Sequence, residues 1–248
     1  MAKKPDPGRC VHCLQFHDEL TWDHVFPESW YPDTTPEDLE KWKIPACLPC
    51  NKDYGRIEED LLIKLGLCID PKNPRGAGIA FKTVRALRSD FGRNDKDANL
   101  RRQKMLRIFR EAKYGKDVPD RGVYPGFEYK GENINGKVGL PLEKDKMKKL
   151  TEKIVRGIMF IGNNKYIESP YHIDFYAYNF DALRDVLENV YSGPWEVFER
   201  PPGLAVLRAL ADEDKMSGIY LIDIWGQFYC IAIVNDIRRL SNRVRGGL

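Results

Sequence analysis

Four of the six cysteines in this chain form two Cys-x-x-Cys pairs, Cys10/Cys13 and Cys47/Cys50. Two such pairs can supply four thiolates to one tetrahedral zinc ion. A zinc site with four protein ligands is structural, because no coordination position stays open for a substrate. Two disulfides are the alternative, and a reducing compartment disfavours them. The spacing therefore predicts a structural Zn²⁺ site with a structured insertion between the pairs.

The insertion contains a second motif, the sequence WDHVFP at residues 22–27, and Cys50 is followed at once by Asn51. In this order the residues resemble the zinc-containing, four-cysteine branch of the HNH (ββα-metal, His-Me finger) endonucleases. In that branch an Asp-His pair lies on a hairpin and an asparagine opens the following helix. The resemblance covers about residues 8–62, a quarter of the chain. It implies a metal-dependent endonuclease with Asp23, His24 and Asn51 as catalytic residues.

Each of these residue types has a chemical reason to be there. A neutral imidazole can take a proton from water near physiological pH, so His24 is the expected general base. Asp23 and Asn51 offer oxygen ligands that suit one catalytic Mg²⁺ or Mn²⁺. Without that chemistry, His24 is a core histidine and Asn51 a simple helix cap. Successive strand residues point to opposite faces, so Asp23 and His24 need a local distortion to address one phosphate.

The sequence also departs from the family pattern. Residues 25–49 contain no asparagine to hold the loop behind His24, a role that Asp33 or Thr34 would have to fill. Position 55 is glycine, so no third metal ligand follows from the resemblance. Glu58, two turns after Asn51, is either a residue that supports the site or, as we favour, an exposed helical carboxylate. The alternative function is thus a non-cleaving, zinc-stabilised nucleic-acid-binding or regulatory protein.

A basic segment follows the motif. Residues 75–116 hold thirteen Lys or Arg against four Asp or Glu, and the rest of the chain is net negative. Amphipathic patterns predict helices at about 78–91 and 98–114. Their cations are either a solvated surface or, as we favour, a contact surface for backbone phosphates. The expected nucleic-acid-binding residues are Lys82, Arg85, Arg88, Arg101, Arg102, Lys104 and Arg107.

The chain length of 248 residues predicts more than one domain. We expect a nuclease module at 1–68, a basic helical segment and linker at 69–124, and an α+β domain at 125–248. Strand patterns predict short strands at 20–26 and 42–46, followed by a helix from 51 to 67. The C-terminal part predicts helices at 143–160 and 180–191, with strands at 173–178, 195–199, 204–210, 218–224 and 228–234. The predicted fold class is α+β, with an antiparallel sheet and helices following the zinc-stapled module.

Composition bounds the setting of the protein. No apolar run approaches the length needed to span a bilayer, and no apolar stretch follows Lys3 and Lys4, so a cytoplasmic protein without a membrane partner is expected. The expected partner is nucleic acid, with double-stranded or branched DNA preferred over RNA. A homodimer is compatible with double-strand cutting, because one such site cuts one strand per engagement.

Overall fold

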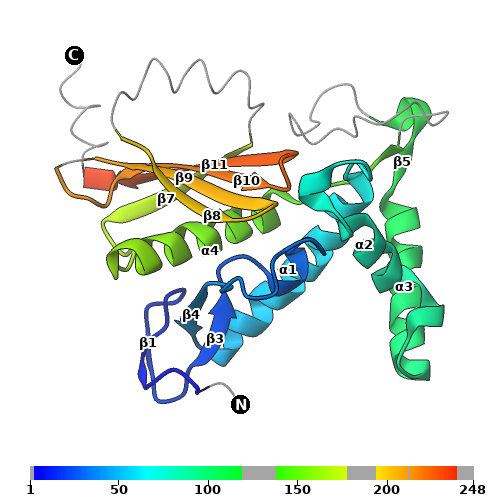
Figure 1. Ribbon diagram of the computed structural model, residues 1–248, viewed down its shortest axis with the longest axis horizontal. Coiled ribbons are helices and arrows are strands. Elements are labelled where there is room, and N and C mark those ends of the chain that lie inside the picture. Colours follow the sequence, from blue (N-terminus) through cyan, green and yellow to red (C-terminus); the bar gives the residue numbers. More distant parts are fainter. Residues whose placement is uncertain (1–2, 119–137, 178–193, 212, 239–248) are drawn as a thin grey trace.

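A computed structural model describes residues 3–118, 138–177, 194–211 and 213–238. Within these ranges the chain is a mixed α+β protein with four α-helices and a five-stranded antiparallel sheet (Figure 1). The predicted helix at 180–191 and most of the linker lie outside the described residues. Short two-stranded pairings join β1 (Gly8–Arg9) to β2 (Phe16–His17), and β5 (Lys113–Tyr114) to β6 (Val138–Gly139).

The N-terminal hairpin and its helix lie close to where the sequence predicts them. Strand β3 (Thr21–His24) pairs antiparallel with β4 (Lys43–Ala46), and helix α1 (Leu48–Cys68) follows directly. β3 ends two residues earlier than expected, before Pro27, which cannot donate a ladder hydrogen bond. Pro49 lies in the first turn of α1, where its missing N–H costs nothing. The unit therefore has the order strand, strand, helix.

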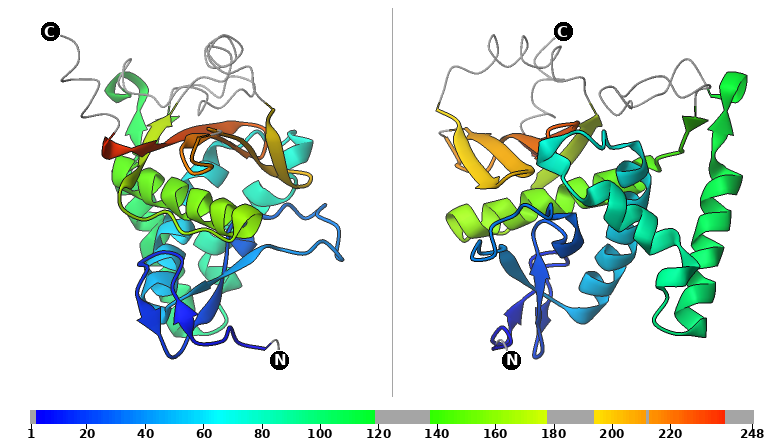
Figure 2. Two further views of the ribbon diagram at one scale, coloured as in Figure 1. Left: turned by 90° about the vertical axis from the view of Figure 1, so that its left-hand side faces the viewer. Right: turned by 45° about the vertical axis from the view of Figure 1, so that its right-hand side comes forward.

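Two helices carry the basic segment. Helix α2 (Ile79–Leu87) packs on α1, and helix α3 (Asp95–Glu111) contacts α2 and projects beside it (Figures 1 and 2). Asn94 caps α3 by accepting a hydrogen bond from the backbone N–H of Asp97 at 3.0 Å. Both helices start and end within a few residues of the predicted bounds.

The five-stranded sheet has the order β7-β11-β10-β9-β8, and every neighbouring pair is antiparallel. Its strands are β7 (Tyr171–Ala177), β8 (Glu196–Arg200), β9 (Leu204–Leu210), β10 (Gly218–Ile224) and β11 (Phe228–Asp236). A tight turn at residues 225–227 joins β10 to β11. Trp225 and Gly226 both have positive φ there, as the hairpin twist requires.

Helix α4 (Lys144–Asn163) lies between the sheet and the N-terminal unit (Figures 1 and 2). It contacts β7 and β11 of the sheet and also α1 and β4. One apolar core continues through all these layers, from Val25 and Leu61 to Ile154, Ile158 and Val206. The module and the sheet thus share one core. No helix in the described part of the chain is long and apolar enough to cross a membrane.

A substitution in α1 tests the α1–α2 packing. A Cβ at Gly66 would lie 2.0 Å from Oγ1 of the buried Thr83, whereas a Cβ at Gly55 in the same helix meets nothing within 4 Å. We expect Gly66→Ala to lower the free energy of unfolding by about 1–3 kcal/mol through overpacking. Gly55→Ala should raise it by about 0.5–1 kcal/mol, because alanine favours a helix over glycine. Urea denaturation measures both, and equal effects would contradict the described packing.

Candidate metal centre and hydrolytic residues

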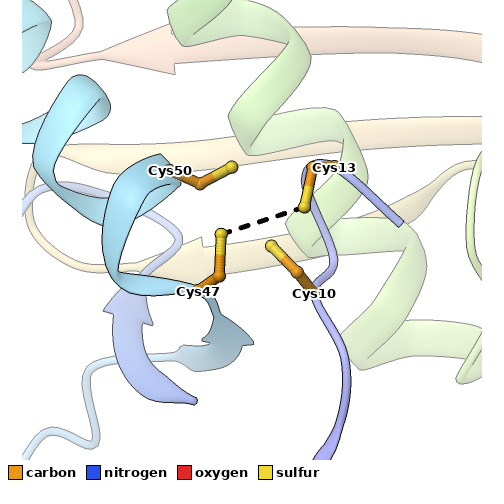
Figure 3. A group of neighbouring side chains, drawn as sticks. All are labelled: Cys10, Cys13, Cys47 and Cys50. Atoms are coloured by element: carbon orange, nitrogen blue, oxygen red, sulfur yellow. Dashed lines mark hydrogen bonds between the residues drawn. The ribbon is translucent and has the colours of Figure 1, made fainter. Parts of the chain in front are cut away.

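The four predicted zinc ligands come together in space. The sulfur atoms of Cys10, Cys13, Cys47 and Cys50 all lie within 4.8 Å of one another (Figure 3). Cys13 Sγ and Cys47 Sγ are 3.8 Å apart, and no disulfide joins any of the cysteines. A tetrahedron of thiolates around zinc has this compactness, since each Zn–S bond measures about 2.3 Å. The cluster can therefore hold one structural zinc ion.

Local backbone structure aims the thiols. The first pair lies on a tight knuckle, in which Leu14 N–H donates to the carbonyl of Cys10 at 2.9 Å and Leu14 adopts positive φ. In the second pair, Cys47 precedes α1 and Cys50 lies in its first turn. Burial raises the pKa of Cys50, and the neighbouring Cys47 adds to the effect. A cation is thus needed to hold these sulfurs together as thiolates.

Asp23 is buried, and both of its carboxylate oxygens have partners. Its side chain is 5% exposed, His12 Nε2 lies 2.8 Å from Oδ2, and Lys153 Nζ of α4 donates to Oδ1 at 2.8 Å. Burial acts to raise the pKa of Asp23, but the hydrogen bond from His12 and the charge of Lys153 hold it below its ordinary value. Asp23 is therefore an anion inside the protein, between the hairpin and α4.

Lys153 also forms an ion pair with Glu58 of α1, and its ammonium lies 5.6 Å from the ring centroid of Tyr54. The side chain of Lys153 is 0% exposed and that of Glu58 is 14% exposed. The expectation that Glu58 is an exposed helical carboxylate is thus wrong. Glu58 lies two turns after Asn51 in α1 and faces α4, which the sequence of α1 alone does not reveal.

His24 lies on the same strand as Asp23 and is half-buried. Its imidazole forms no hydrogen bond within the described ranges. Burial lowers the pKa of His24, and the charge of Lys43 adds to that effect, while Glu28 opposes it. Lys43 is the cross-strand partner of His24 and is exposed. A lowered pKa favours the neutral imidazole of His24 at physiological pH, and the exposed Lys43 lies opposite it.

Asn51 ties the first turn of α1 to strand β3. Its Nδ2 donates to Thr21 Oγ1 at 2.9 Å and to the carbonyl of Trp22 at 3.2 Å. Asn51 therefore contacts the backbone of β3 immediately before the Asp23-His24 dipeptide. Asp33 pairs with Lys82 at 2.8 Å. Oδ1 of Asp33 therefore contacts Lys82 and does not hold the loop behind His24 in place of the missing asparagine.

Most of the predicted phosphate-binding cations pair with carboxylates. Arg88 pairs with Asp90 on the surface, and Lys104 and Arg107 of α3 pair with acidic residues of α1. Lys82 and Arg101 form further ion pairs, with Asp33 and Asp97. Among the residues described, Arg85 and Arg102 form no ion pair, and Arg102 is exposed. The charge excess of the segment is therefore partly neutralised within the protein itself.

Comparison with known proteins adds no neighbour to this geometry. No protein-family model matches the chain, no curated protein matches it, and no solved structure matches it.

Proposed function

We propose that this protein is an endonuclease of the HNH type that hydrolyses phosphodiester bonds in double-stranded or branched DNA. The observation that carries the proposal is the hydrogen bond from Asn51 to the carbonyl of Trp22. It joins a helix start to a hairpin strand immediately before Asp23 and His24, beside a four-cysteine cluster. From this order of strand, strand, helix, Asp-His dipeptide and asparagine we infer an HNH-type site.

The proposed chemistry uses His24 as the general base. A water molecule beside the neutral imidazole attacks the phosphorus atom, and its proton passes to His24. The bond between phosphorus and the 3′-oxygen breaks, and the departing oxygen takes a proton from solvent water, which leaves a 3′-hydroxyl and a 5′-phosphate. Lys43, opposite His24 on the hairpin, supplies positive charge for the phosphate oxygens. Both side chains lie on the hairpin, so the substrate contacts this face.

The catalytic Mg²⁺ or Mn²⁺ expected at Asp23 and Asn51 does not fit the present arrangement. Both oxygens of Asp23 already accept hydrogen bonds, and an ammonium lies 2.8 Å from one of them. A divalent cation bound at about 2.1 Å from that oxygen would face the charge of Lys153 at short range. No step of the proposed reaction is therefore assigned to a metal at Asp23.

The engagement of both Asp23 oxygens by His12 and Lys153 also favours a second function, a zinc-stabilised nucleic-acid-binding or regulatory protein that does not cleave. If Asp23 serves only to hold α4 on the module, the hairpin retains its shape without a catalytic metal. This alternative predicts DNA binding without turnover.

A cleavage panel tests the two functions against each other. Zinc-loaded protein is incubated with supercoiled plasmid, a four-way DNA junction and single-stranded RNA, in Mg²⁺, in Mn²⁺ and without added divalent ions. Nicks with 5′-phosphate ends on either DNA support the nuclease. Binding in a gel without any product on the three substrates supports the alternative.

Binding itself gives a prediction for the basic segment. Arg102 is exposed and forms no ion pair within the described ranges, whereas Lys104 is held by Glu59. We expect Arg102→Ala to weaken DNA binding more than Lys104→Ala, and to reduce the slope of log affinity against log salt by about 1. Fluorescence anisotropy at several salt concentrations measures both. Equal slopes in wild type and Arg102→Ala would remove this residue from the phosphate surface.

A further inference from the structure

The ammonium of Lys153 lies at the centre of a closed cage. Asp23 Oδ1 on β3 accepts from it at 2.8 Å, Glu58 on α1 pairs with it from a second side, and the ring of Tyr54 lies 5.6 Å away. None of the Lys153 side chain is exposed. Three elements, β3, α1 and α4, therefore close around one positive charge.

This cage has the composition of a cation site. Two carboxylates converge on one point, and a buried histidine, His12, fixes the second oxygen of one of them at 2.8 Å. Buried carboxylates without a counter-charge are very unfavourable, so some cation must stand there for the module to fold. Asp23 is also the carboxylate expected from the sequence to bind a catalytic divalent metal. Here an ammonium from the chain itself occupies the position next to Asp23.

We propose that Lys153 is a tethered cation that replaces a divalent metal at Asp23, so that the wild-type protein binds no Mg²⁺ or Mn²⁺ through this carboxylate. Lys153 lies on α4, which contacts both the sheet and the hairpin. The chain between residues 69 and 248 thus supplies the module with its internal cation. The module depends on that part of the chain for charge balance as well as for packing. The metal-binding part of this inference stands on geometry alone, and only its consequence for cleavage rests on the proposed function.

A close backbone approach keeps the lysine in place. A Cβ at Gly157, one turn after Lys153, would lie 2.7 Å from Cγ2 of Val25, at the end of β3. Only a glycine lets α4 come this near to the hairpin without displacing Val25. The reach from the α4 backbone to Asp23 is therefore fixed by packing, and the ammonium has no free path to solvent.

The test measures Mn²⁺ binding rather than activity. Zinc-loaded wild type, Lys153→Met and the control Lys149→Met are titrated with Mn²⁺ and followed by electron paramagnetic resonance. Lys149 lies one turn away and pairs with Asp53 on the surface at 3.2 Å. We expect no Asp23-dependent Mn²⁺ binding by wild type or Lys149→Met. Lys153→Met should bind one Mn²⁺ at least about tenfold more tightly than wild type binds any Mn²⁺. Glu58→Gln in the Lys153→Met background should remove this binding.

Two results would overturn the proposal. One is wild type that binds Mn²⁺ and loses it in Asp23→Asn. The other is folded Lys153→Met that binds Mn²⁺ no better than wild type. If Lys153→Met does not fold, the wild-type and Asp23→Asn titrations decide alone. Equal Mn²⁺ binding by these two proteins then supports the proposal. Because no substrate is present, a protein that cuts nothing can still pass this test, which separates it from the nuclease proposal.

Discussion

Replacing Cys47 with serine, or stripping the protein with a strong chelator, should unfold the N-terminal hairpin and the start of α1. The apolar core around the cysteines is small, since its buried members are Cys10, Leu20, Ala46 and Cys47. Structural zinc in comparable small modules binds with an apparent free energy of about 10–16 kcal/mol, which is available to folding only when metal is present. We therefore expect loss of a cooperative unfolding transition for this region, and not a small shift in Tm.

The measurement combines metal content with hydrogen exchange of residues 8–60 before and after chelation. Cys68→Ala is the matched control, because Cys68 is a free cysteine outside the four-sulfur cluster. It should retain one zinc per chain and native exchange in this segment. A chelated protein that keeps slow exchange from residue 8 to 60 would show that the four cysteines are not a zinc site.

The second large effect concerns the ion pairs that α4 makes with the N-terminal unit. Asp23 pairs with the buried Lys153. Asp53 pairs with Lys149, which lies one turn before Lys153 in α4, and the side chains of Asp53 and Lys149 are both more than half exposed. Asp23→Ala should cost about 3–5 kcal/mol of unfolding free energy, because it leaves a buried ammonium with one carboxylate fewer. Asp53→Ala should cost no more than about 1 kcal/mol, since water screens a surface pair.

Chemical denaturation of both variants, each loaded with zinc, measures this difference. The comparison also bears on how Asp23 is interpreted. If Asp23 served only as a ligand to a catalytic metal, its loss would lower activity. The stability of the zinc-loaded protein in buffer without Mg²⁺ or Mn²⁺ would then stay nearly unchanged. Equal stabilities of Asp23→Ala and Asp53→Ala would therefore contradict the buried ion pair.

Patterns that are local in the sequence predicted much of this structure. The strands predicted at 204–210 and 218–224 match β9 and β10, and the paired cysteines indicate the metal cluster. Helix α1 begins three residues earlier than predicted, because Pro49 is favourable in a first helical turn and the sequence interpretation began the helix at the Asn51 cap.

The partners of Asp23 and Glu58 escaped prediction because they come from far along the chain. Lys153 is separated from Asp23 by 130 residues, and nothing near either residue specifies the other. One signal was present in the sequence: Lys153 falls between Leu150 and Gly157 at helical spacing, on the side of α4 that turns inward. A lysine within such a stripe is a candidate for a buried ion pair.

The domain organisation also depends on contacts between residues that are distant in the sequence. Composition and length suggested a small module joined to a larger α+β domain, and nothing in the structure tests the proposed boundaries themselves. The packing nevertheless shows Trp225, between β10 and β11, donating its indole N–H to the carbonyl of Trp30 at 2.7 Å. A contact between aromatic residues so distant in sequence cannot be derived from local patterns.

The proposed nuclease activity is tested most directly by nicking of supercoiled plasmid at low salt. Wild type, His24→Ala and His172→Ala are compared. His172 is exposed on β7 and serves as the matched control for losing an imidazole. We predict nicking by wild type and His172→Ala, with a loss of about 10²-fold or more in His24→Ala. Equal nicking by His24→Ala and wild type would contradict the assignment of His24 as the base. Binding of the plasmid by all three without any nick would leave a zinc-stabilised binding protein as the function.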